Sequence, residues 1–431
     1  MSRALAWTRQ HPILLGLTSL VVLLLLSGLH HPDPHAGTFQ FPGLLPSSYS
    51  PLTPFSQPGT PVFDHSWLTR SQQRRYAHLR SPRIPGSLRL QSGQGKYMFT
   101  TLTRNIADQL PDLLNTLYIV VNFLGPRNCY FSIMEGPSDD ATPQVLEEVL
   151  RPMLLSIGVP ASHIILKLRQ RHIDFGKVNR ISALAMLRNE ALAPLWHGWE
   201  DTAAVVYFND VFLNPTDILE LLHQHVRAGE AAGKETGITS GLDWWKKKPE
   251  YYYDVWVGRT IEGDLFYPME SSWTPSDDLF PTSPKSKEEY ANLNPFQVFS
   301  TWAGLAVLAA TPFLEPHRLR FRRSDGSRDE CAASECSLMA NDFWKAGWGR
   351  VQVVPSVQVS YERNVAEDIL EELSKQKKEL GWEDGVPPDW RDPHVNWIAE
   401  PPQKVRCHPW PDAPGLSANV WENTRWVDPW I

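Results

Sequence analysis

Cysteine is scarce in this 431-residue sequence, which contains four: Cys129, Cys331, Cys336 and Cys407. An even number permits two disulfides in an oxidising compartment, in any of three connectivities. Cys331 and Cys336 lie close enough in sequence to pair across a turn. A zinc site is the alternative for that pair, but its spacing does not match a zinc finger and no histidine is close to it. Whether Cys129 pairs with Cys407 stays open.

A basic stripe is also lacking. The 41 Lys and Arg residues and the 48 Asp and Glu residues are spread along the chain and give a net charge of −7. We therefore expect no binding to nucleic acid. No Asn-x-Ser/Thr sequon with a residue other than Pro at x occurs, so glycosylation gives no indication of the compartment. The hydrophobic fraction of 42% suffices for one large core or two moderate ones. The 18 tryptophans suit surfaces that stack on sugars, and core packing is the alternative for each.

Long hydrophobic runs are absent except at residues 13–29, an uncharged stretch preceded by Arg3 and Arg9. Its length is at the lower limit of a membrane span, and no small-residue cleavage site follows closely. Positive charges before the run favour a cytoplasmic N-terminus. The sequence therefore predicts a cytoplasmic segment at 1–12, a transmembrane signal anchor at 13–29 and a luminal remainder. A cleaved signal peptide is the alternative.

The expected luminal part divides into three regions by composition. Residues 30–90 are rich in proline and lack helical or strand periodicity, which predicts an extended stem. Within this stem, residues 70–80 are basic and could form a short helix, although a solvated segment is the favoured interpretation. Residues 91–380 carry the elements of a catalytic domain, and residues 381–431 form a tail rich in Pro and Trp.

Segments of strand and helix character alternate in the first half of the catalytic region. The predicted strands are 97–101, 129–134, 164–167 and 203–208, and the predicted helices are 106–124, 143–157, 180–195 and 215–227. Such alternation predicts an α/β fold with a mixed, mostly parallel sheet and helices on both faces. Ligands bind such sheets at the C-terminal ends of the strands. After residue 245 the pattern loosens, apart from a strand at 351–362 and an amphipathic helix at 365–380.

Asp210 follows the predicted strand at 203–208 and is preceded by Asn209. A carboxylate there could hold Mn²⁺ or Mg²⁺ against the diphosphate of a nucleotide sugar, because both ions prefer oxygen ligands. It could instead shape the turn into the next helix, although Asn214, directly before Pro215, is the better helix cap. No Asp-x-Asp pair occurs in the chain, which weakens the prediction of a metal site.

An acidic segment follows the predicted strand at 129–134. Glu135, Asp139 and Asp140 could accept hydrogen bonds from a ribose or a base, as carboxylates do in other nucleotide-binding sheets. Asp140, or Thr142 beside it, could instead cap the following helix. Glu135 is too far from that helix to be explained as a cap.

Basic and amide side chains on the predicted helix at 180–195 suit a diphosphate. Arg180, Arg188 and Asn189 supply the guanidinium and amide donors that phosphate oxygens require. An ordinary surface position is the alternative, above all for Arg180. Arg188 and Asn189 interrupt a helix that is otherwise rich in Ala and Leu, so they are the better candidates.

Two later segments offer residues for a sugar or for the reacting atoms. Trp302 and Gly304 could stack on a sugar ring and let the backbone approach it, with core packing as the alternative. Glu335 and Asp342 lie seven residues apart, which places them on one face if the segment is helical. Either could orient an acceptor hydroxyl or stabilise an oxocarbenium-like charge. A pair of solvated surface acids is the alternative.

Several segments in order over about residues 95–362 resemble one known family. They are CYFSIMEGPSDDATPQVLEEVL, LAMLRNEALAPL, VVYFNDVFLNPTDILELL, TSGLDW, YYDVWVGRTIEGDLF, FQVFSTWAGLAVLAATPF and SECSLMANDFWKAGWGRVQVVPSVQVSY. In this combination the chain is similar to the fungal capsule-associated α-1,3-mannosyltransferases. Two departures from the family pattern occur: Thr301 stands where Cys is common, and the loop after residue 133 reads MEGPS instead of the usual YESGS.

The resemblance implies a GT-A type nucleotide-sugar-binding fold in a single-pass Golgi membrane enzyme. It also implies GDP-mannose as donor, a glycan or polysaccharide acceptor, a divalent metal, and α-1,3 transfer with retention of configuration. By position in the family motifs, Glu135, Asp139 and Asp140 belong to the nucleotide loop and Asp210 to the metal site. Arg188 and Asn189 belong to the donor helix, Trp302 and Gly304 to the sugar region, and Glu335 and Asp342 to a late acidic motif.

Two alternatives to this function remain. The donor could be another nucleotide sugar, since only the resemblance selects mannose. The chain could also be a non-catalytic, membrane-anchored carbohydrate-binding or assembly protein, which would need neither a metal nor a site for diphosphate. The presence of Asp210 together with Arg188 and Asn189 favours an enzyme, a glycosyltransferase.

Overall fold

The computed structural model describes residues 61–64, 66–84, 93–244, 252–267, 278–388, 395–410 and 424–429. The transmembrane anchor predicted at 13–29 and most of the predicted stem lie outside these residues. Within the described ranges, no helix is both long enough and apolar enough to cross a membrane.

The described elements alternate along the chain as the sequence predicts up to about residue 240. The helices are α3 (Arg70–Tyr76), α4 (Leu110–Leu124), α5 (Thr142–Val145), α6 (Arg151–Ser156), α7 (Arg180–Leu192), α8 (Pro215–Ala232), α9 (Pro284–Ala291), α10 (Glu335–Lys345) and α11 (Arg363–Glu379). The strands are β1 (Lys96–Thr103), β2 (Cys129–Glu135), β3 (Ile164–Lys167), β4 (Thr202–Phe208), β5 (Ile238–Trp244), β6 (Arg259–Thr260), β7 (Phe296–Ser300), β8 (Leu305–Ala309), β9 (Val351–Ser360), β10 (Val405–Cys407) and β11 (Arg425–Val427).

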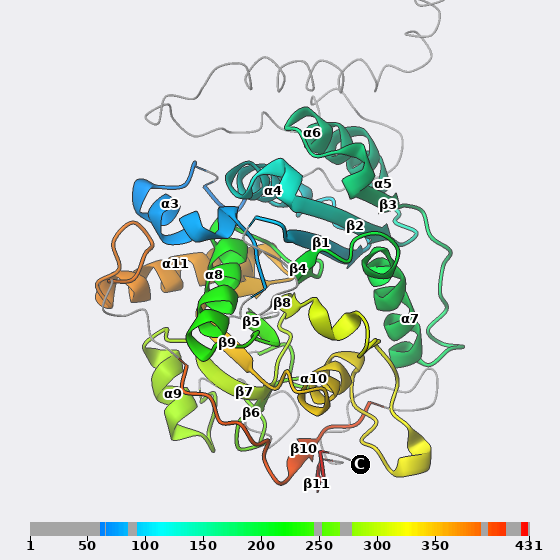
Figure 1. Cartoon of the computed structure of the whole chain (residues 1–431), viewed down its shortest axis with the longest axis vertical. Helices are drawn as coiled ribbons and strands as arrows, with labels where there is room; N and C mark the ends of the chain where they lie inside the picture. The colour runs from blue at the N-terminus through cyan, green and yellow to red at the C-terminus, as the bar shows by residue number, and fades with distance from the viewer. Residues whose placement is uncertain are drawn as a thin grey trace, which may run out of the picture.

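A nine-stranded mixed sheet forms the centre of the molecule, in the order β3-β2-β1-β4-β8-β5-β9-β7-β6 (Figure 1). The first four strands are parallel, as predicted. β8 runs antiparallel to both of its neighbours, β4 and β5, and β7 runs antiparallel to β9. The sheet is therefore less parallel than the sequence predicts, because the second half of the chain pairs with strands far away in sequence. A separate two-stranded sheet pairs β10 with β11.

Side chains of each strand alternate between two hydrophobic cores, one on each face of the sheet. In β4, Val206 and Phe208 belong to one core, and Val205 and Tyr207 belong to the other. α8 packs on β5, β8 and β9, whereas α7 packs on β1 and β2. Both faces of the sheet are covered, so every residue of β4 is buried. The long apolar strand in the sequence is explained by this double covering.

Two predicted helices differ from the observed ones. The helix expected at 106–124 begins at Leu110, because residues before it form a loop at the end of β1. The helix expected at 143–157 contains a π-helical segment at Leu146–Leu150. Pro152, the second residue of α6, has no N–H to continue the α-helical hydrogen bonds, which accounts for the irregularity. Asn214 caps α8 as predicted, and Asp217 completes the capping box.

The basic segment at 70–80 is folded onto the domain, which corrects the interpretation of a solvated segment. α3 begins at the N-cap Thr69, and Tyr76 is buried. Arg75 donates from Nε and Nη2 to the two carboxylate oxygens of Glu220 on α8, at 2.9 and 2.8 Å. The Tyr76 hydroxyl donates to the same carboxylate at 2.9 Å. The end of the predicted stem is thus part of the folded structure.

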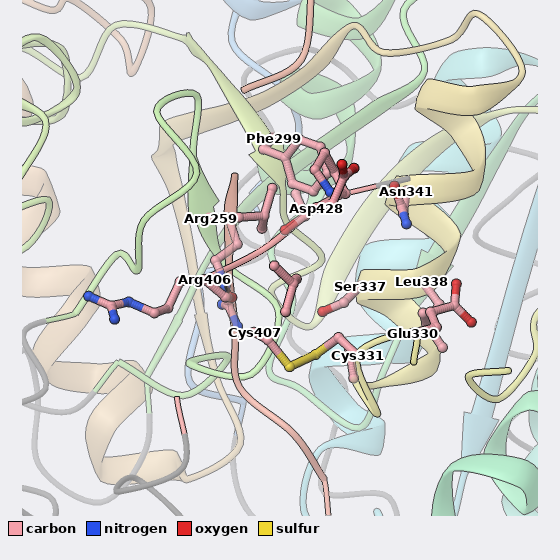
Figure 2. Close-up of a pocket in the computed structure, with 15 residues that line it drawn as sticks. Arg259, Phe299, Glu330, Cys331, Ser337, Leu338, Asn341, Arg406, Cys407 and Asp428 are labelled. Carbon is pink, nitrogen blue, oxygen red and sulfur yellow. Dashed lines mark hydrogen bonds between the residues drawn. A yellow bond between two sulfur atoms is a disulfide. The ribbon is translucent and has the colours of Figure 1, made fainter. Parts of the chain in front are cut away.

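The disulfide links Cys331 to Cys407, so Cys331 does not form the pair with Cys336 that their short spacing permits, and Cys129 does not pair with Cys407. Cys336 lies in the first turn of α10 and is buried without a disulfide, as is Cys129. Figure 2 shows the disulfide between the loop that precedes α10 and the strand β10. It holds the C-terminal segment on the domain. Thr301 forms a hydrogen bond with Ser240, with 2.6 Å between the two hydroxyl oxygens.

Candidate active site

The C-terminal ends of β1, β2, β3, β4, β5 and β9 lie at the same edge of the sheet, and β8 begins there. Polar residues at or next to these ends are Arg104, Glu135, Asn209, Asp210, Asp243 and Tyr361. A ligand site is expected at this edge, because strand ends of a sheet with helices on both faces leave backbone and side chains open there.

Asp210 stands at the centre of this edge. The neighbouring Asn209 is fixed by two hydrogen bonds: its N–H donates to the Gly304 carbonyl at 2.8 Å, and its side-chain amide donates to the Tyr361 hydroxyl at 3.1 Å. Asp210 itself is exposed. Partial desolvation by neighbouring protein atoms raises the pKa of its carboxyl, while the Asp210 N–H and the charges of Arg188 and Arg180 oppose the shift. An accessible but partly desolvated carboxylate suits a ligand that brings positive charge.

Gly304 is required by the shape of this edge. Its φ of +66° lies in the left-handed region, and an added Cβ would lie 3.0 Å from the Val211 side chain. The glycine lets the start of β8 approach the end of β4 and accept the hydrogen bond from Asn209. Its role in the structure is to shape the site, whereas direct contact with a sugar stays a prediction.

Arg188 and Glu335, predicted for different roles, form one buried ion pair. The Arg188 Nε donates to Glu335 Oε1 at 2.9 Å, and the two side chains are 8% and 3% exposed. The guanidinium carbon lies 4.7 Å from the ring centre of Trp302 and 4.8 Å from that of Tyr207. The Arg188 Nη1 has no hydrogen bond of acceptable geometry within the described structure. Glu335 and two aromatic rings therefore hold the cation in place behind Asp210.

Trp302 is not the open sugar platform expected from the sequence. Only 1% of its surface is exposed, and its ring packs on Tyr207 and Phe321, with centroid distances of 5.1 and 5.6 Å. Core packing, the alternative considered above, describes its position. The ring contributes to the site indirectly, by contacting the Arg188 guanidinium.

Arg180 is exposed at the first turn of α7, near Asp210. Its guanidinium carbon lies 5.1 Å from the ring centre of Phe175 and 5.7 Å from that of Trp410 in the C-terminal segment. Trp410 in turn contacts Trp256, with ring centres 5.5 Å apart. Arg180 is thus an accessible cation between aromatic rings. No pattern in the sequence indicates that residue 410 reaches this edge.

Asn189 binds the backbone of Phe321. Its amide donates to the Phe321 carbonyl at 2.8 Å, and its side-chain oxygen accepts from the Phe321 N–H at 2.9 Å. This two-sided pairing pins the segment around Phe321 onto α7. The ring centre of Phe321 lies 5.6 Å from the Arg188 guanidinium carbon. By binding the backbone of Phe321, Asn189 therefore helps to position a ring that packs on Arg188.

The predicted nucleotide-loop acids organise the loops after β1 and β2. Glu135 is fully buried and accepts from the N–H groups of Ser138 and Arg169, at 3.1 and 2.6 Å. Asp140 accepts from the N–H groups of Ala107 and Thr142, at 3.0 and 2.9 Å. The helix cap expected from Asp140 or Thr142 is absent, because the N-cap of α5 is Ala141 without a side-chain bond.

Asp139 differs from these two acids. Its side chain is 86% exposed and pairs with Arg104 at 3.5 Å. Among the three predicted nucleotide-loop carboxylates, Asp139 is therefore the one open to a ligand. Contact of all three with a ribose or a base stays a prediction.

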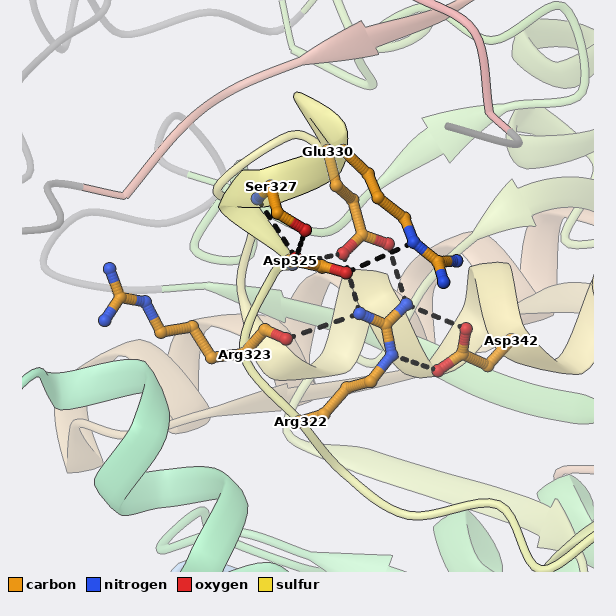
Figure 3. Close-up of polar contacts among 7 residues, drawn as sticks. Arg322, Arg323, Asp325, Ser327, Glu330 and Asp342 are labelled. Carbon is orange, nitrogen blue, oxygen red and sulfur yellow. Dashed lines mark hydrogen bonds and ion pairs between the residues drawn. The ribbon is translucent and has the colours of Figure 1, made fainter.

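Asp342 does not join Glu335. The segment is helical, as the prediction requires, but the two acids bind different arginines. Arg322 donates to both oxygens of Asp342, at 2.7 and 2.9 Å, and to both oxygens of Glu330 at 2.7 Å (Figure 3). The bidentate pairing with Arg322 occupies both carboxylate oxygens of Asp342. Asp342 therefore belongs to a structural cluster, two helical turns from Glu335.

Sequence reasoning missed two carboxylates, Asp243 and Asp254. Asp243 lies near the end of β5 and is fully buried, and its Oδ1 accepts from the Asp254 N–H at 3.2 Å. The Tyr361 hydroxyl donates to Asp243 Oδ2 at 3.4 Å. Asp254 Oδ2 accepts from the Ala303 N–H at 2.8 Å. The signal was present in the segment TSGLDW, an acid at the end of an apolar strand, as in the segment that ends at Asp210.

A divalent cation would have Asp210 as its protein ligand at this edge. The described residues contain no group of three or more His, Cys, Asp or Glu side chains arranged to hold a metal. Magnesium and similar ions, however, are commonly bound by one or two carboxylates together with substrate phosphates. The exposed carboxylate of Asp210 fits this second arrangement, with phosphate oxygens and water completing the coordination.

Fold and site define an α/β enzyme whose sheet edge brings together carboxylates and arginines. The chain belongs to the family described as cryptococcal mannosyltransferase 1, which it matches over residues 96–342, and it is a glycosyltransferase. It is 51% identical, over 442 residues, to the alpha-1,3-mannosyltransferase CMT1 of Cryptococcus neoformans var. neoformans serotype D. That match covers 96% of this chain and 91% of the relative. The resemblance seen in the sequence is confirmed.

Solved structures of similar architecture are much more distant. TarS of S. aureus (residues 1–349) matches at 12% identity and a TM-score of 0.34, over 67% of each chain. The mannosyltransferase PcManGT of Pyrobaculum calidifontis, solved with GDP-Man and Mn²⁺, matches at 12% identity and a TM-score of 0.32. That match covers 67% of this chain and 62% of the other. At this distance neither structure assigns a ligand to this chain.

Proposed function

We propose that this chain is an α-1,3-mannosyltransferase that transfers mannose from GDP-mannose to a glycan or polysaccharide acceptor, with retention of configuration. The observation that carries the proposal is the 51% identity to an alpha-1,3-mannosyltransferase over 96% of the chain. The mixed α/β fold, here assigned to the GT-A type, and the charged sheet edge support it. Donor, linkage and retention come from the relative and from the family resemblance.

Different residues of the chain would contact the donor diphosphate, stabilise its charge and hold the metal ion. Arg180 is accessible and can bind a phosphate oxygen directly. Arg188 is buried and held by Glu335, so it contributes a fixed positive charge without needing to reorganise. Asp210 would hold Mn²⁺ or Mg²⁺, which supplies further positive charge to the departing diphosphate. The exposed Asp139 is the carboxylate available to ribose or base.

Transfer with retention requires the acceptor oxygen to approach the face of the sugar that the diphosphate leaves. The bond between the anomeric carbon and the phosphate oxygen breaks, and its electrons remain on the phosphate. The acceptor oxygen then bonds to the anomeric carbon and gives up its proton to the phosphate. No covalent bond to the protein is needed, so none of the carboxylates is assigned as a nucleophile.

A donor screen tests the proposal. The purified full-length chain is incubated with GDP-mannose, UDP-glucose, UDP-xylose or UDP-glucuronic acid, with Mn²⁺ or with a chelator, and an α-mannoside acceptor. We expect transfer from GDP-mannose only, loss of transfer with the chelator, and an α-1,3 linkage by NMR. Turnover of a different donor would point to another sugar specificity. Absence of turnover with every donor would favour the non-catalytic carbohydrate-binding alternative.

A variant at Asp210 tests the metal assignment. Asp210→Asn should lose Mn²⁺-dependent binding of GDP, measured by calorimetry. Asp329→Asn is the matched control, because Asp329 lies on an exposed loop with φ of 55°, a conformation that Asn also tolerates. Equal Mn²⁺-dependent affinity of GDP for Asp210→Asn and wild type would remove Asp210 from the metal site.

We further propose a Golgi location with a single N-terminal span. The apolar run at 13–29 supports the anchor, and a disulfide in the folded domain fits an oxidising compartment. The full-length chain should stay in the membrane pellet after alkaline carbonate extraction and should resist protease until the vesicles are opened. Release by carbonate would contradict the anchor, and digestion in intact vesicles would contradict the luminal orientation.

A further inference from the structure

Two carboxylates at the sheet edge have no part in the function proposed above. Asp243 comes from the end of β5, and Asp254 comes from the loop that follows it. They are directly linked, since the Asp254 N–H donates to Asp243 Oδ1 at 3.2 Å. Two acids side by side in a protein interior destabilise it when both are ionised. Their presence next to a donor site therefore calls for a functional explanation.

A chain of hydrogen bonds connects this pair to Asp210. Asn209, next to Asp210, donates to the Tyr361 hydroxyl at 3.1 Å, and Tyr361 donates to Asp243 at 3.4 Å. On the other side, the Gly304 carbonyl accepts from Asn209, and the N–H of the adjacent Ala303 donates to Asp254 at 2.8 Å. Asp254 is thus fixed close to the residues that flank Asp210.

The two acids differ in accessibility. Asp243 is fully buried and accepts hydrogen bonds at both carboxylate oxygens. Asp254 is only half-buried, and within the described residues only its Oδ2 accepts a hydrogen bond. Its Oδ1 can therefore accept a hydrogen bond from a ligand. Of the pair, Asp254 is the acid that a substrate can reach.

The charges around the pair show which acid is ionised. Burial raises the pKa of Asp254 to about 6, while the Ala303 N–H and the charge of Arg188 oppose the shift and Glu335 adds to it. Burial, together with the charge on Asp254, raises the pKa of Asp243 well above its ordinary range. Asp254, the more exposed acid of the pair, therefore ionises more readily, whereas full burial beside Asp254 favours the protonated form of Asp243.

We propose that Asp254 is a catalytic carboxylate of the transfer reaction: its free oxygen accepts a hydrogen bond from a hydroxyl of the transferred hexose, and its charge stabilises the positive charge that develops at the anomeric carbon. The assignment rests on the proposed function. Asp254 forms no bond to carbon and takes no proton in this step. The glycosidic bond forms to the acceptor oxygen, whose proton goes to the departing phosphate.

Two asparagine variants test the proposal against a merely structural role. Asp254→Asn keeps the acceptor for the Ala303 N–H but removes the charge, and Asp243→Asn resembles the neutral form that Asp243 already has. We expect kcat for Asp254→Asn to fall about 100-fold, a loss in the range found when one preorganised electrostatic group is removed. The affinity for GDP and the Tm should stay close to those of wild type. Asp243→Asn should lose less of its kcat than Asp254→Asn, and the control Asp329→Asn should keep its activity.

The outcomes separate this inference from the proposed function. Both variants are assayed with whichever donor the wild-type chain turns over, so a different sugar specificity leaves the test intact. Near wild-type kcat for Asp254→Asn would overturn the proposal. A fall in kcat that is accompanied by weaker GDP binding and a lower Tm would assign Asp254 a structural role and would also overturn the proposal. A larger loss for Asp243→Asn than for Asp254→Asn would place the working charge on Asp243. A wild-type chain that is inactive with every donor would overturn both the proposed function and the proposed role of Asp254.

Discussion

Asp254 should set the acid limit of the reaction. Burial raises its pKa to about 6, with Arg188 and the Ala303 N–H opposing and Glu335 adding to the shift, while Asp243 stays neutral in this range. Only ionised Asp254 can stabilise positive charge, so kcat/KM should fall below a pH of about 6. Below this pH, we expect kcat/KM to fall about tenfold per pH unit when it is measured at saturating Mn²⁺. This fall is the acid limb of the pH profile.

Protonation of Asp254 does not destabilise the folded protein, so unfolding does not explain the loss of activity in acid. A carboxyl whose pKa is raised in the folded state binds its proton more tightly there, so falling pH through this window favours the folded form. Circular dichroism should therefore show a folded protein where activity has already declined. The residual activity of Asp254→Asn should lack the limb. A wild-type limb that persists unchanged in this variant would assign it to another group.

Arg188 offers a test of the buried ion pair. Arg188→Met removes the cation and leaves Glu335, which is 3% exposed, without its partner. Loss of one member of a buried pair typically costs about 3–5 kcal/mol, so the free energy of unfolding in urea should fall by that order. The double variant Arg188→Met with Glu335→Gln should regain much of the loss, because no charge is left unpaired. Additive losses in the double variant would show that the two side chains are not coupled.

At the scale of elements, the sequence predicts the first half of the sheet well. Strands β1 to β4 and the helices between them follow one another locally, and each is marked by its own hydrophobic pattern. β5, β8 and β9 instead depend on pairing between residues far apart in sequence, such as Ile238 with Val351, and local patterns carry little information about it. The antiparallel place of β8 was therefore not predicted.

The same distinction applies to the site. Asp210 could be found because it lies two residues after a long buried strand, and Asp243 lies near the end of another buried strand. Asp254 could not be found in this way, since it lies in a loop and reaches the site through a hydrogen bond to Ala303. Trp302 was wrongly predicted as a sugar-stacking residue from its residue type. Packing against residues far away in sequence buries its ring, which local sequence does not reveal.

Helix α3 yields a prediction for the attachment of the stem. Arg75 and Glu220 are 8% and 6% exposed, and burial alone would favour a neutral Glu220. The charge and hydrogen bonds of Arg75 nevertheless hold the pKa of Glu220 well below its ordinary value. Arg75→Ala should lower the free energy of unfolding by about 3–5 kcal/mol at neutral pH. Arg74→Ala, at an exposed position of the same helix, is the control.

The pH dependence of this stabilisation has a defined sign. Because the pKa of Glu220 is depressed in the folded state, its contribution is fully present above the unfolded value of 4.5 and is lost as pH falls below it. The difference in unfolding free energy between Arg75→Ala and wild type should therefore shrink in acid. A difference that is constant with pH would show that Arg75 acts by packing alone.

At the scale of the whole molecule, the C-terminal segment reaches the candidate active site. The disulfide ties Cys407 to Cys331, and Arg259 donates to the Arg406 carbonyl at 2.6 Å. Three residues beyond the disulfide, Trp410 contacts both Arg180 and Trp256. A region that reads in the sequence as an irregular tail thus positions an aromatic ring against a cation proposed to bind phosphate.

Reduction of the disulfide should therefore affect both stability and catalysis. The linked cysteines are 76 residues apart, and closing a loop of this length stabilises the folded state by about 4–5 kcal/mol in the chain-entropy description. Dithiothreitol should lower the Tm and raise the KM for the donor, because Trp410 is no longer held against Arg180. Cys407→Ser should show both changes without reductant and should not respond to it. Cys129→Ala, at a buried free cysteine that reductant leaves unchanged, controls for other thiol effects. If reductant lowers the Tm of wild type while KM stays constant, the disulfide serves the fold alone and Trp410 does not contribute to donor binding.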